Sequence, residues 1–581
     1  MKKIFTLICS LMIAVSALFG SACGPAGIPT GPNNGGGNNG GDNGNIIVDK
    51  NKTQLYVANL QGGIGYEWFR KAIARFEEKF ADVVYEPGTK GVQIIPEDEY
   101  TVNGRWLLLA SDMYDVYFTE NLTYNEYIRK GEVLDLTDVV RAPAKTSPTT
   151  SESVTIESKL NADQKAGLTA QNGNYYAIPH YQAFRGLSYD VDLFDDYKLY
   201  FAADKDNGNG GFIVRNTDAR SVGPNGVSGD YDDGLPATID EFFVLCDKMV
   251  SLGITPFVWP GDSVGYTEYL CDVFADNLGG ADAVRLNYTY DSGASTTKII
   301  TSFDSNGNPV VEDVAITTDN GYLLKQQYGK YYGLEVFERV ISKIDQYAYS
   351  LSNNDSNFTQ LNAQEEYIYS SLENKPIGMI IDGTYWWTEA KDAYNRSVGQ
   401  FGDRAKVRNF AWMPVPTAIS AADQAQNAKD PVFRDIMKSY CIVNAKVADN
   451  QYKTQLAKDF VSFCYSDESL QEFTTTTGVA KGLNYSLTEA QYNSLSPFAK
   501  SCWNIREEAD IVNVLPIAKI AIDNEQSLLW DLFTTTIAGQ AYNTPFYAFI
   551  AKENAEDYFK GQWSNFETWR SSYERYFTVG V

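Results

Sequence analysis

The chain has 581 residues, of which 44% are hydrophobic and 21% are charged, and its formal charge at pH 7 is -26. These proportions are ordinary for a globular protein, and the length predicts two or more lobes. The acidic balance argues against nucleic acid as a partner, because phosphate binding needs clustered Lys and Arg.

The amino terminus has the pattern of a secretory signal peptide. Two lysines precede an apolar run at residues 4–19, and small residues follow before Cys23. The run is too short for a membrane span. A cysteine directly after the small residues resembles a bacterial lipoprotein signal, although Gly20 stands where such signals usually carry Leu. The resemblance implies that residues 1–22 are removed and that Cys23 is acylated, for instance with palmitate. Ordinary cleavage after Ala22 is the alternative.

The next segment, residues 23–45, is almost wholly Gly, Asn and Pro. Such a composition buries no apolar surface, so we expect a flexible linker. Behind an acylated cysteine it would act as a tether, and without one it would be a terminus with no role.

The fold signal begins with an apolar strand pattern at residues 55–60, followed by a glycine turn and a helical pattern at residues 66–80. In the helical pattern Phe69, Ile73 and Phe76 recur on one face. The order of strand, turn and helix predicts an α/β fold. The turn sequence GGIG lacks the GxGxxG spacing of dinucleotide sites. Further strands are predicted at residues 111–118 and 174–179, and a helix at residues 239–253.

Two segments have the composition of added loops or hairpins, residues 204–234 and residues 287–313. The first is rich in acids, and calcium prefers such clustered oxygen ligands, but the segment lacks the spacing of an EF-hand. We therefore expect a solvated loop, no metal and no cofactor. The acids of the calcium alternative are Asp204, Asp206, Asp230, Asp232 and Asp233.

The sequence offers little support for catalysis. His180 is the only histidine, which excludes HExxH zinc sites, and no GxxxxGK[ST] motif occurs. A lone histidine beside a proline is typical of a loop or a junction between lobes. Five cysteines follow Cys23 at wide spacing, so we expect buried thiols, Cys246 and Cys464 among them, rather than disulfides.

Six blocks of sequence occur in an order that resembles one known family. The third block, NGNYYAIPHYQAFRGLSYDVDLFDDYKLY, carries the family's proline and its YN.dlf spacing, with Asp190 in place of the usual Asn. The blocks are residues 55–80, 114–138, 172–200, 253–261, 375–390 and 457–478. Together they resemble the extracellular solute-binding proteins of family 1, the carbohydrate-binding group that includes maltose-binding protein and feeds ABC importers.

The resemblance implies a periplasmic-binding-protein-like α/β fold, in which a hinge joins two α/β lobes with a ligand cleft between them. By this similarity, residues 46–182 and 406–465 form one lobe, and residues 183–405 and 466–581 form the other. Several chain crossings between the lobes are therefore expected, and the lobes would close around the ligand.

A sugar site needs flat aromatic side chains for the ring faces and polar side chains for the hydroxyl groups. The family commonly places a stacking Trp two residues after the glycine that is Gly383 here, where this chain has Tyr385. Trp68 could instead pack in the core, and at least one of the three adjacent aromatics at 385–387 is expected to do so. The candidate ligand-binding residues are Tyr66, Trp68, Glu120, Asn121, Tyr181, Gln182, Arg185, Trp259, Tyr266, Tyr385, Trp386, Trp387 and Trp530.

The sequence thus predicts a non-catalytic, monomeric receptor that binds an oligosaccharide and delivers it to ABC permease subunits. Its predicted place is the extracellular face of the cell membrane, held by the lipid on Cys23, in a bacterium of Gram-positive type. The alternatives are a secreted glycoside hydrolase, which also uses aromatics and carboxylates, and a surface lipoprotein for glycan adhesion.

Overall fold

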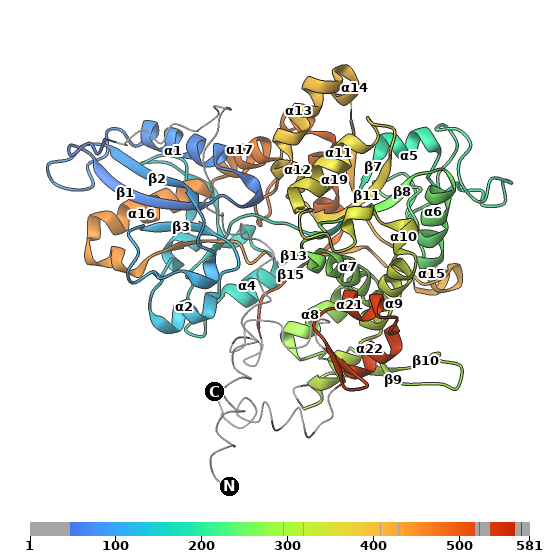
Figure 1. Cartoon of the computed structure of the whole chain (residues 1–581). Coiled ribbons are helices and arrows are strands. Elements are labelled where there is room, and N and C mark those ends of the chain that lie inside the picture. The colour runs from blue at the N-terminus through green and yellow to red at the C-terminus, as the bar shows by residue number, and fades with distance from the viewer. Residues whose placement is uncertain are drawn as a thin grey trace, which may run out of the picture. The chain divides into compact units, whose positions relative to one another are not determined.

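A computed structural model describes residues 47–517 and 535–563, apart from positions 294, 318, 407, 428 and 436, together with the isolated positions 522, 567 and 571 (Figure 1). Cys23, the linker and the candidate Trp530 lie outside the described residues. The chain from Val48 onward forms one unit. Within the described part, every helix is too short or too polar to cross a membrane.

The first sheet confirms the strand and helix predicted at the start of the mature chain. Its strands lie in the order β2-β1-β3-β14-β6, in which β1 is parallel to β2 and β3, and β14 is antiparallel to β3 and β6. The side chains of β1 alternate toward a buried core. The bounds are β1 (Thr53–Leu60), β2 (Val92–Tyr100), β3 (Val116–Thr119), β6 (Ile178–Pro179) and β14 (Tyr440–Val443).

Helices pack on this sheet through the predicted apolar face of α1 (Figure 1). Phe69 and Phe76 are fully buried, and the ring of Phe76 lies 5.1 Å from that of Phe460 on α16. α17 also lies against α1, where Arg75 Nη2 donates to Ser469 Oγ at 2.7 Å. The helices of this part are α1 (Glu67–Lys79), α2 (Tyr124–Lys130), α3 (Thr137–Val140), α4 (Ala162–Leu168), α16 (Gln451–Cys464) and α17 (Asp467–Thr477).

The second sheet has the order β12-β7-β11-β8, with β11 parallel to β8 and antiparallel to β7. Its central strand β11 is buried along its whole length, so helices cover both of its faces. Its strands are β7 (Arg185–Asp190), β8 (Thr255–Val258), β11 (Ile377–Gly383) and β12 (Phe410–Met413). The helices that follow or cover them include α5 (Val191–Tyr197), α6 (Ile239–Ser251), α7 (Glu268–Gly279), α9 (Tyr328–Ser342), α11 (Gln360–Ser370), α12 (Trp386–Glu389), α13 (Lys391–Phe401) and α19 (Pro497–Glu508).

Smaller elements extend this plan. The predicted hairpin is confirmed as an antiparallel pair, β9 and β10, and helices α21 and α22 pack on α9. A short parallel pair, β13 and β15, lies beside α7 and α8. Their bounds are α8 (Ala281–Thr289), β9 (Thr297–Phe303), β10 (Pro309–Val314), α15 (Ala421–Asn427), β13 (Val432–Asp435), α18 (Glu489–Ser494), β15 (Asp510–Asn513), α21 (Pro545–Ile550) and α22 (Ala555–Gly561).

The chain passes between the two sheets three times, at residues 180–184, 437–439 and 478–488, and main-chain hydrogen bonds join these crossings. The amide of His180 donates to the carbonyl of Ser439 at 2.9 Å, and the amide of Gln182 donates to the carbonyl of Ala480 at 2.9 Å. Tyr181 also pairs with Lys481 across an antiparallel bridge. The three crossings therefore form one hydrogen-bonded ribbon.

Strand pairing bears on where the lobes divide. The predicted first lobe includes residues 406–465, yet β12 within that range pairs with β7 of the second sheet, whereas β14 pairs with β3 of the first. α17, which the predicted division gives to the second lobe, lies against α1 of the first.

The lone histidine lies in the first crossing and is fully buried. Its Nδ1 lies 2.7 Å from Lys481 Nζ, which is also 4.6 Å from the centre of the Trp68 ring. Burial lowers the pKa of Lys481 to about 7, and burial together with Lys481 lowers the pKa of His180. The described cysteines have free thiols, and Cys246 and Cys464 are buried as predicted.

A buried ion pair joins β7 to the segment before β12. Variants that break this pair test how much it stabilises the packing of the second sheet. Asp190 caps α5 by accepting from the Leu193 amide at 3.1 Å, and it pairs with Arg408 Nη2 at 2.5 Å. We expect Asp190→Ala to lower the free energy of unfolding by about 3–5 kcal/mol, because a buried guanidinium is left unpaired. Asp190→Asn should lose about 1 kcal/mol less, because Asn keeps the helix cap. Urea unfolding followed by tryptophan fluorescence measures both.

The control is the double variant Asp190→Asn/Arg408→Met, which removes both charges and should recover most of the stability lost in Asp190→Asn. A double variant no more stable than Asp190→Asn would contradict this account.

Candidate functional site

The two sheets approach each other at the glycine turn after β1. A Cβ built on Gly63 would lie 2.7 Å from the Cβ of Tyr385 and 3.0 Å from the Cγ of Glu389, so only glycine allows this approach. Tyr385 follows β11 of the second sheet, yet it is buried within the apolar core of the first. The turn and the start of α12 thus form a contact surface between the two halves of the fold.

Glu120 lies on the first half of this surface, directly after β3. It is 3% exposed, and Tyr181 Oη donates a hydrogen bond to its carboxylate. Gly62 lies beside it with a φ of 42°, and a Cβ there would meet Glu120 Oε1. Burial raises the pKa of Glu120, and the Tyr181 hydrogen bond and the charge of Arg185 only partly oppose this effect.

Asp382 and Glu389 lie on the second half, at the end of β11 and in α12. The side-chain amide of Gln364 donates to Asp382 Oδ2 at 3.0 Å and to Glu389 Oε2 at 2.8 Å. Burial raises the pKa of both carboxyls, and Asp382 further raises the pKa of Glu389. Glu120 also raises the pKa of Glu389, so the charge of an acid on the first half acts across the contact on an acid of the second. We call Glu120, Asp382 and Glu389 the carboxylate cluster.

Hydrogen-bond acceptors dominate around this cluster. Besides the three carboxylates, the buried Oε1 of Gln364 has no hydrogen-bond partner among the described residues. Arg185, at the start of β7, supplies positive charge that lowers the pKa of Asp382, and its guanidinium lies 4.4 Å from the centre of the Tyr269 ring. A ligand that suits this surface must therefore bring donors, and a polyhydroxylated molecule does so through its hydroxyl groups.

Trp68 and Trp386 are buried in the cores of the two halves. Trp68 is 3% exposed, and its ring lies 5.0 Å from that of Phe118. Trp386 is fully buried, and its Nε1 donates to Ser188 Oγ at 2.9 Å. The ring of the half-buried Trp387 lies 5.0 Å from that of Tyr394.

The remaining predicted residues of the second half lie around the start of α7. The ring of Tyr266 lies 4.9 Å from that of Tyr269, the ring on which Arg185 stacks. Trp259 is fully buried, and its amide donates to Ser352 Oγ at 3.1 Å. Tyr266 and Arg185 thus share one aromatic neighbour, whereas Trp259 packs in the core.

On the first half, Tyr66 is half-buried directly before α1. Asn121 has a positive φ of 51°, and its amide donates to the carbonyl of Met437, so its backbone joins the second crossing. Tyr66 thus follows the glycine turn in the chain, and Asn121 follows Glu120.

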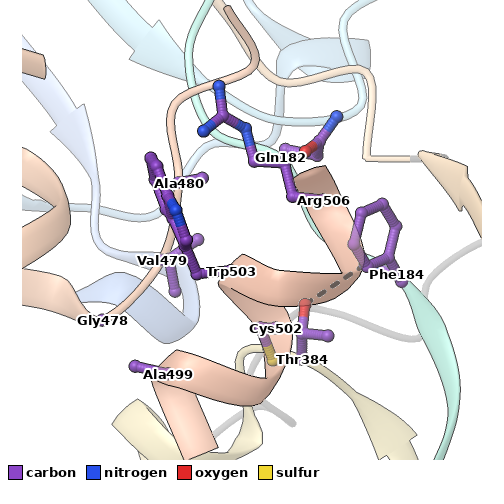
Figure 2. A pocket seen from close by; sticks show the side chains of 10 residues that line it. All are labelled: Gln182, Phe184, Thr384, Gly478, Val479, Ala480, Ala499, Cys502, Trp503 and Arg506. Atoms are coloured by element: carbon purple, nitrogen blue, oxygen red, sulfur yellow. Dashed lines mark hydrogen bonds between the residues drawn. The ribbon is translucent and has the colours of Figure 1, made fainter. Parts of the chain in front are cut away.

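Gln182 lines a small cavity at the crossings, shown in Figure 2. The amide of Phe184 donates to Thr384 Oγ1 at 3.2 Å on one side, and Trp503 and Arg506 of α19 close another. Its volume of about 20 Å³ has room for roughly one water molecule, far below the hundreds of Å³ of a ligand pocket.

Sequence reasoning missed Gln364, Asp382, Glu389 and Trp106. Gln364 reaches Asp382 and Glu389 because α11 packs on β11, and no local pattern shows that packing. Trp106 is 64% exposed, and it follows Gly104, whose amide donates to the carbonyl of Glu120 at 2.8 Å. Trp106 is thus an exposed tryptophan two residues from a main-chain hydrogen bond to Glu120, and it is a candidate platform for a sugar ring.

The chain matches no protein-family profile and no curated protein. Among solved structures, the apo form of RafE from Streptococcus pneumoniae is similar, with a TM-score of 0.51, 11% identity, and coverage of 90% of this chain and 99% of that one. The solute-binding protein RafE in complex with raffinose has a TM-score of 0.50 and 12% identity, with the same coverage. A structure from a study of xylan utilization by Caldanaerobius polysaccharolyticus has a TM-score of 0.50 and 15% identity, and covers 88% of this chain and 99% of that one. The likeness confirms the predicted fold class, two α/β lobes joined by a hinge.

The carboxylate cluster predicts how stability depends on pH. Burial raises the pKa of Asp382 and Glu389 above the value of about 4 in an unfolded chain, so the folded protein holds protons that the unfolded chain has released. The free energy of unfolding should therefore fall as the pH rises from about 4 through the raised pKa values. Calorimetry should give a lower Tm at pH 8.5 than at pH 5.5.

The comparison variant is Asp382→Asn/Glu389→Gln, which cannot release these protons. Its stability difference between the two pH values should be smaller than that of the wild type by at least about 1 kcal/mol. An unchanged difference would assign the pH dependence to other groups.

Proposed function

We propose that this protein is a non-catalytic receptor of the extracellular solute-binding protein family 1, and that it binds a carbohydrate, an oligosaccharide by preference, for an ABC importer. The observation that carries the proposal is the carboxylate cluster, whose members come from both lobes at the place where the lobes meet. The fold it shares with RafE, which has been solved in complex with raffinose, supports the same class of ligand.

The proposed ligand set differs from the residues that the sequence suggested. It keeps Glu120, Tyr181, Arg185 and Tyr385, and it adds Asp382, Glu389 and Gln364. Sugar hydroxyls would donate to the three carboxylates and to Gln364 Oε1, the buried acceptor that has no partner among the described residues. Tyr66, Tyr266 and Trp106 are proposed as aromatic contacts at the margins. Trp68, Trp259 and Trp386 are proposed as core residues.

We propose that the chain passes from one lobe to the other at the three hydrogen-bonded crossings. On this division β14, α16 and α17 belong with the first sheet, and β12 and α19 belong with the second. Separation of the lobes would hydrate the carboxylate cluster, and a ligand that contacts both lobes would favour closure.

We further propose that Cys23 carries a lipid and that residues 24–45 tether the receptor as a monomer to the outer face of the cell membrane. A tether of this length has a mean reach of roughly 25 Å as a random coil, enough to place the cleft beside membrane-bound permease subunits. The signal pattern at residues 4–23 supports this proposal.

Binding is tested by isothermal titration calorimetry against oligosaccharides that include raffinose and xylo-oligosaccharides. Glu120→Gln and Asp382→Asn should each weaken binding of a sugar that the wild type binds, by about tenfold or more, because each replaces a charged acceptor. Glu489→Gln on the exposed surface of α18 is the matched control and should leave affinity unchanged.

Two outcomes would contradict the proposal that the protein is a receptor. One is affinity that stays unchanged in both cleft variants. The other is release of shorter sugars during the incubation, which would indicate a glycoside hydrolase. Binding to the interiors of long glycans as tightly as to short oligosaccharides would instead favour an adhesion protein.

Lobe closure is tested at Gly63, where a side chain would separate the contact with Tyr385. We expect Gly63→Ala to weaken sugar binding by roughly tenfold, about 1.4 kcal/mol, and to increase the radius of gyration of the ligand-bound protein in small-angle X-ray scattering. The control is Gly399→Ala on α13, where a Cβ meets nothing within 4 Å. Equal affinities for the two variants would show that closure does not use this contact.

A further inference from the structure

A second group of acids lies far from the carboxylate cluster in sequence, in the segment that leads from α5 to α6. Asp230, Asp232 and Asp233 each offer a carboxylate oxygen, and the three oxygens lie within 4.8 Å of one another. The sequence predicted a solvated loop here, but Asp232 has no exposed surface, so that prediction is wrong for this residue.

Two oxygens of this group are buried without a hydrogen-bond donor among the described residues. Asp232 Oδ2 accepts from the amide of Asn225 at 3.0 Å, while its Oδ1 has no partner. Asp233 Oδ2 accepts from the amide of Gly229 at 2.8 Å, and its Oδ1 is likewise buried and unpartnered. Buried carboxylate oxygens are normally satisfied by donors or by metal ions, so these two oxygens point to a missing partner.

The cationic side chain whose charge acts on Asp233 does not fill that place. Arg220 lowers the pKa of Asp233, but its Nη2 donates to Asp195 at 3.0 Å and its guanidinium lies 3.5 Å from the centre of the Tyr200 ring. In the part of the chain that the structure describes, no cationic side chain forms an ion pair with these three acids.

We propose that Asp230, Asp232 and Asp233 bind one calcium ion. Calcium takes six to eight oxygen ligands in flexible geometry, so three carboxylates with water molecules at the remaining positions suit it better than the strict octahedron of magnesium. Asp204 and Asp206, which the sequence grouped with these acids, do not belong to the cluster of three carboxylates. The amide of Asp206 donates instead to the carboxylate of Asp204 within its own turn.

The ion would fasten this loop to the second lobe. Gly223 has a φ of 64°, and a Cβ there would lie 2.4 Å from Asp232 Oδ1, so the loop backbone passes directly beside the buried acid. The next residue, Pro224, accepts through its carbonyl from Thr417 Oγ1 at 2.9 Å, and Gln424 donates to the carbonyl of Gly223 at 3.2 Å. Calcium would therefore stabilise the attachment of the loop to the chain between β12 and α15.

The test uses the purified full chain, stripped of metal with EGTA and then titrated with CaCl₂ or MgCl₂. We expect calorimetry to show one calcium site per chain in the micromolar to millimolar range, with magnesium at least tenfold weaker, and calcium to raise the Tm by several degrees. Asp232→Asn should abolish the calcium-dependent rise in Tm. Asp204→Asn/Asp206→Asn is the matched control and should keep it.

Asp232→Asn keeps the acceptor for the Asn225 amide, so in EGTA we expect it to be as stable as the wild type. If it fails to fold, Asp233→Asn, at a half-buried position, should weaken calcium binding at least tenfold. The proposal is overturned if the wild type binds no calcium, or if calcium raises the Tm of Asp232→Asn, or of a folded Asp233→Asn, as much as that of the wild type. It is also overturned if the Asp204→Asn/Asp206→Asn variant loses the site.

Discussion

The three hydrogen-bonded crossings are the constraint on which the rest of the structure depends. Because His180 bonds to Ser439 and Gln182 bonds to Ala480, the chain segments that leave the first sheet run beside those that return to it. This ribbon fixes which strand ends face each other. Glu120 lies one residue beyond β3, Tyr181 lies within the ribbon, and Asp382 lies near the end of β11, so all three reach the same surface.

The approach of the lobes opposes the ionisation of the acids it buries. Glycine at positions 62 and 63 lets the turn lie against Glu120 and Tyr385, and this contact excludes water from three carboxyl groups. Their raised pKa values express that cost, since burial without enough donors favours the protonated form. On the proposed function, a ligand rich in hydroxyl groups would supply the missing donors, so the geometry that is unfavourable for an ionised empty cleft would favour closure around a sugar.

Local patterns in the sequence were sufficient for the first strand and helix, because the helix face of Phe69, Ile73 and Phe76 depends only on spacing. They were also sufficient for the hairpin at β9 and β10, which depends on turn residues. They could not tell which aromatic side chains would be buried, because the burial of Trp68 and Tyr385 depends on what distant segments bring to them. Asp382 and Gln364 were missed for the same reason, since the pairing of β11 with β7 and the packing of α11 are long-range.

Part of the acidic charge of the chain lies inside the fold. Buried acids occur at the contact between the lobes and in the loop of Asp232, and both places hold acceptor oxygens that the described chain does not satisfy. The two places differ in their access to solvent and in the kind of ligand that their acids suit. On the proposed function the cleft would open with the hinge, and it combines acids with aromatics and a guanidinium, which would suit an exchangeable ligand with many weak donors. The loop has no such hinge and concentrates three acids within a few ångströms, which suits a compact, doubly charged ion that stays bound.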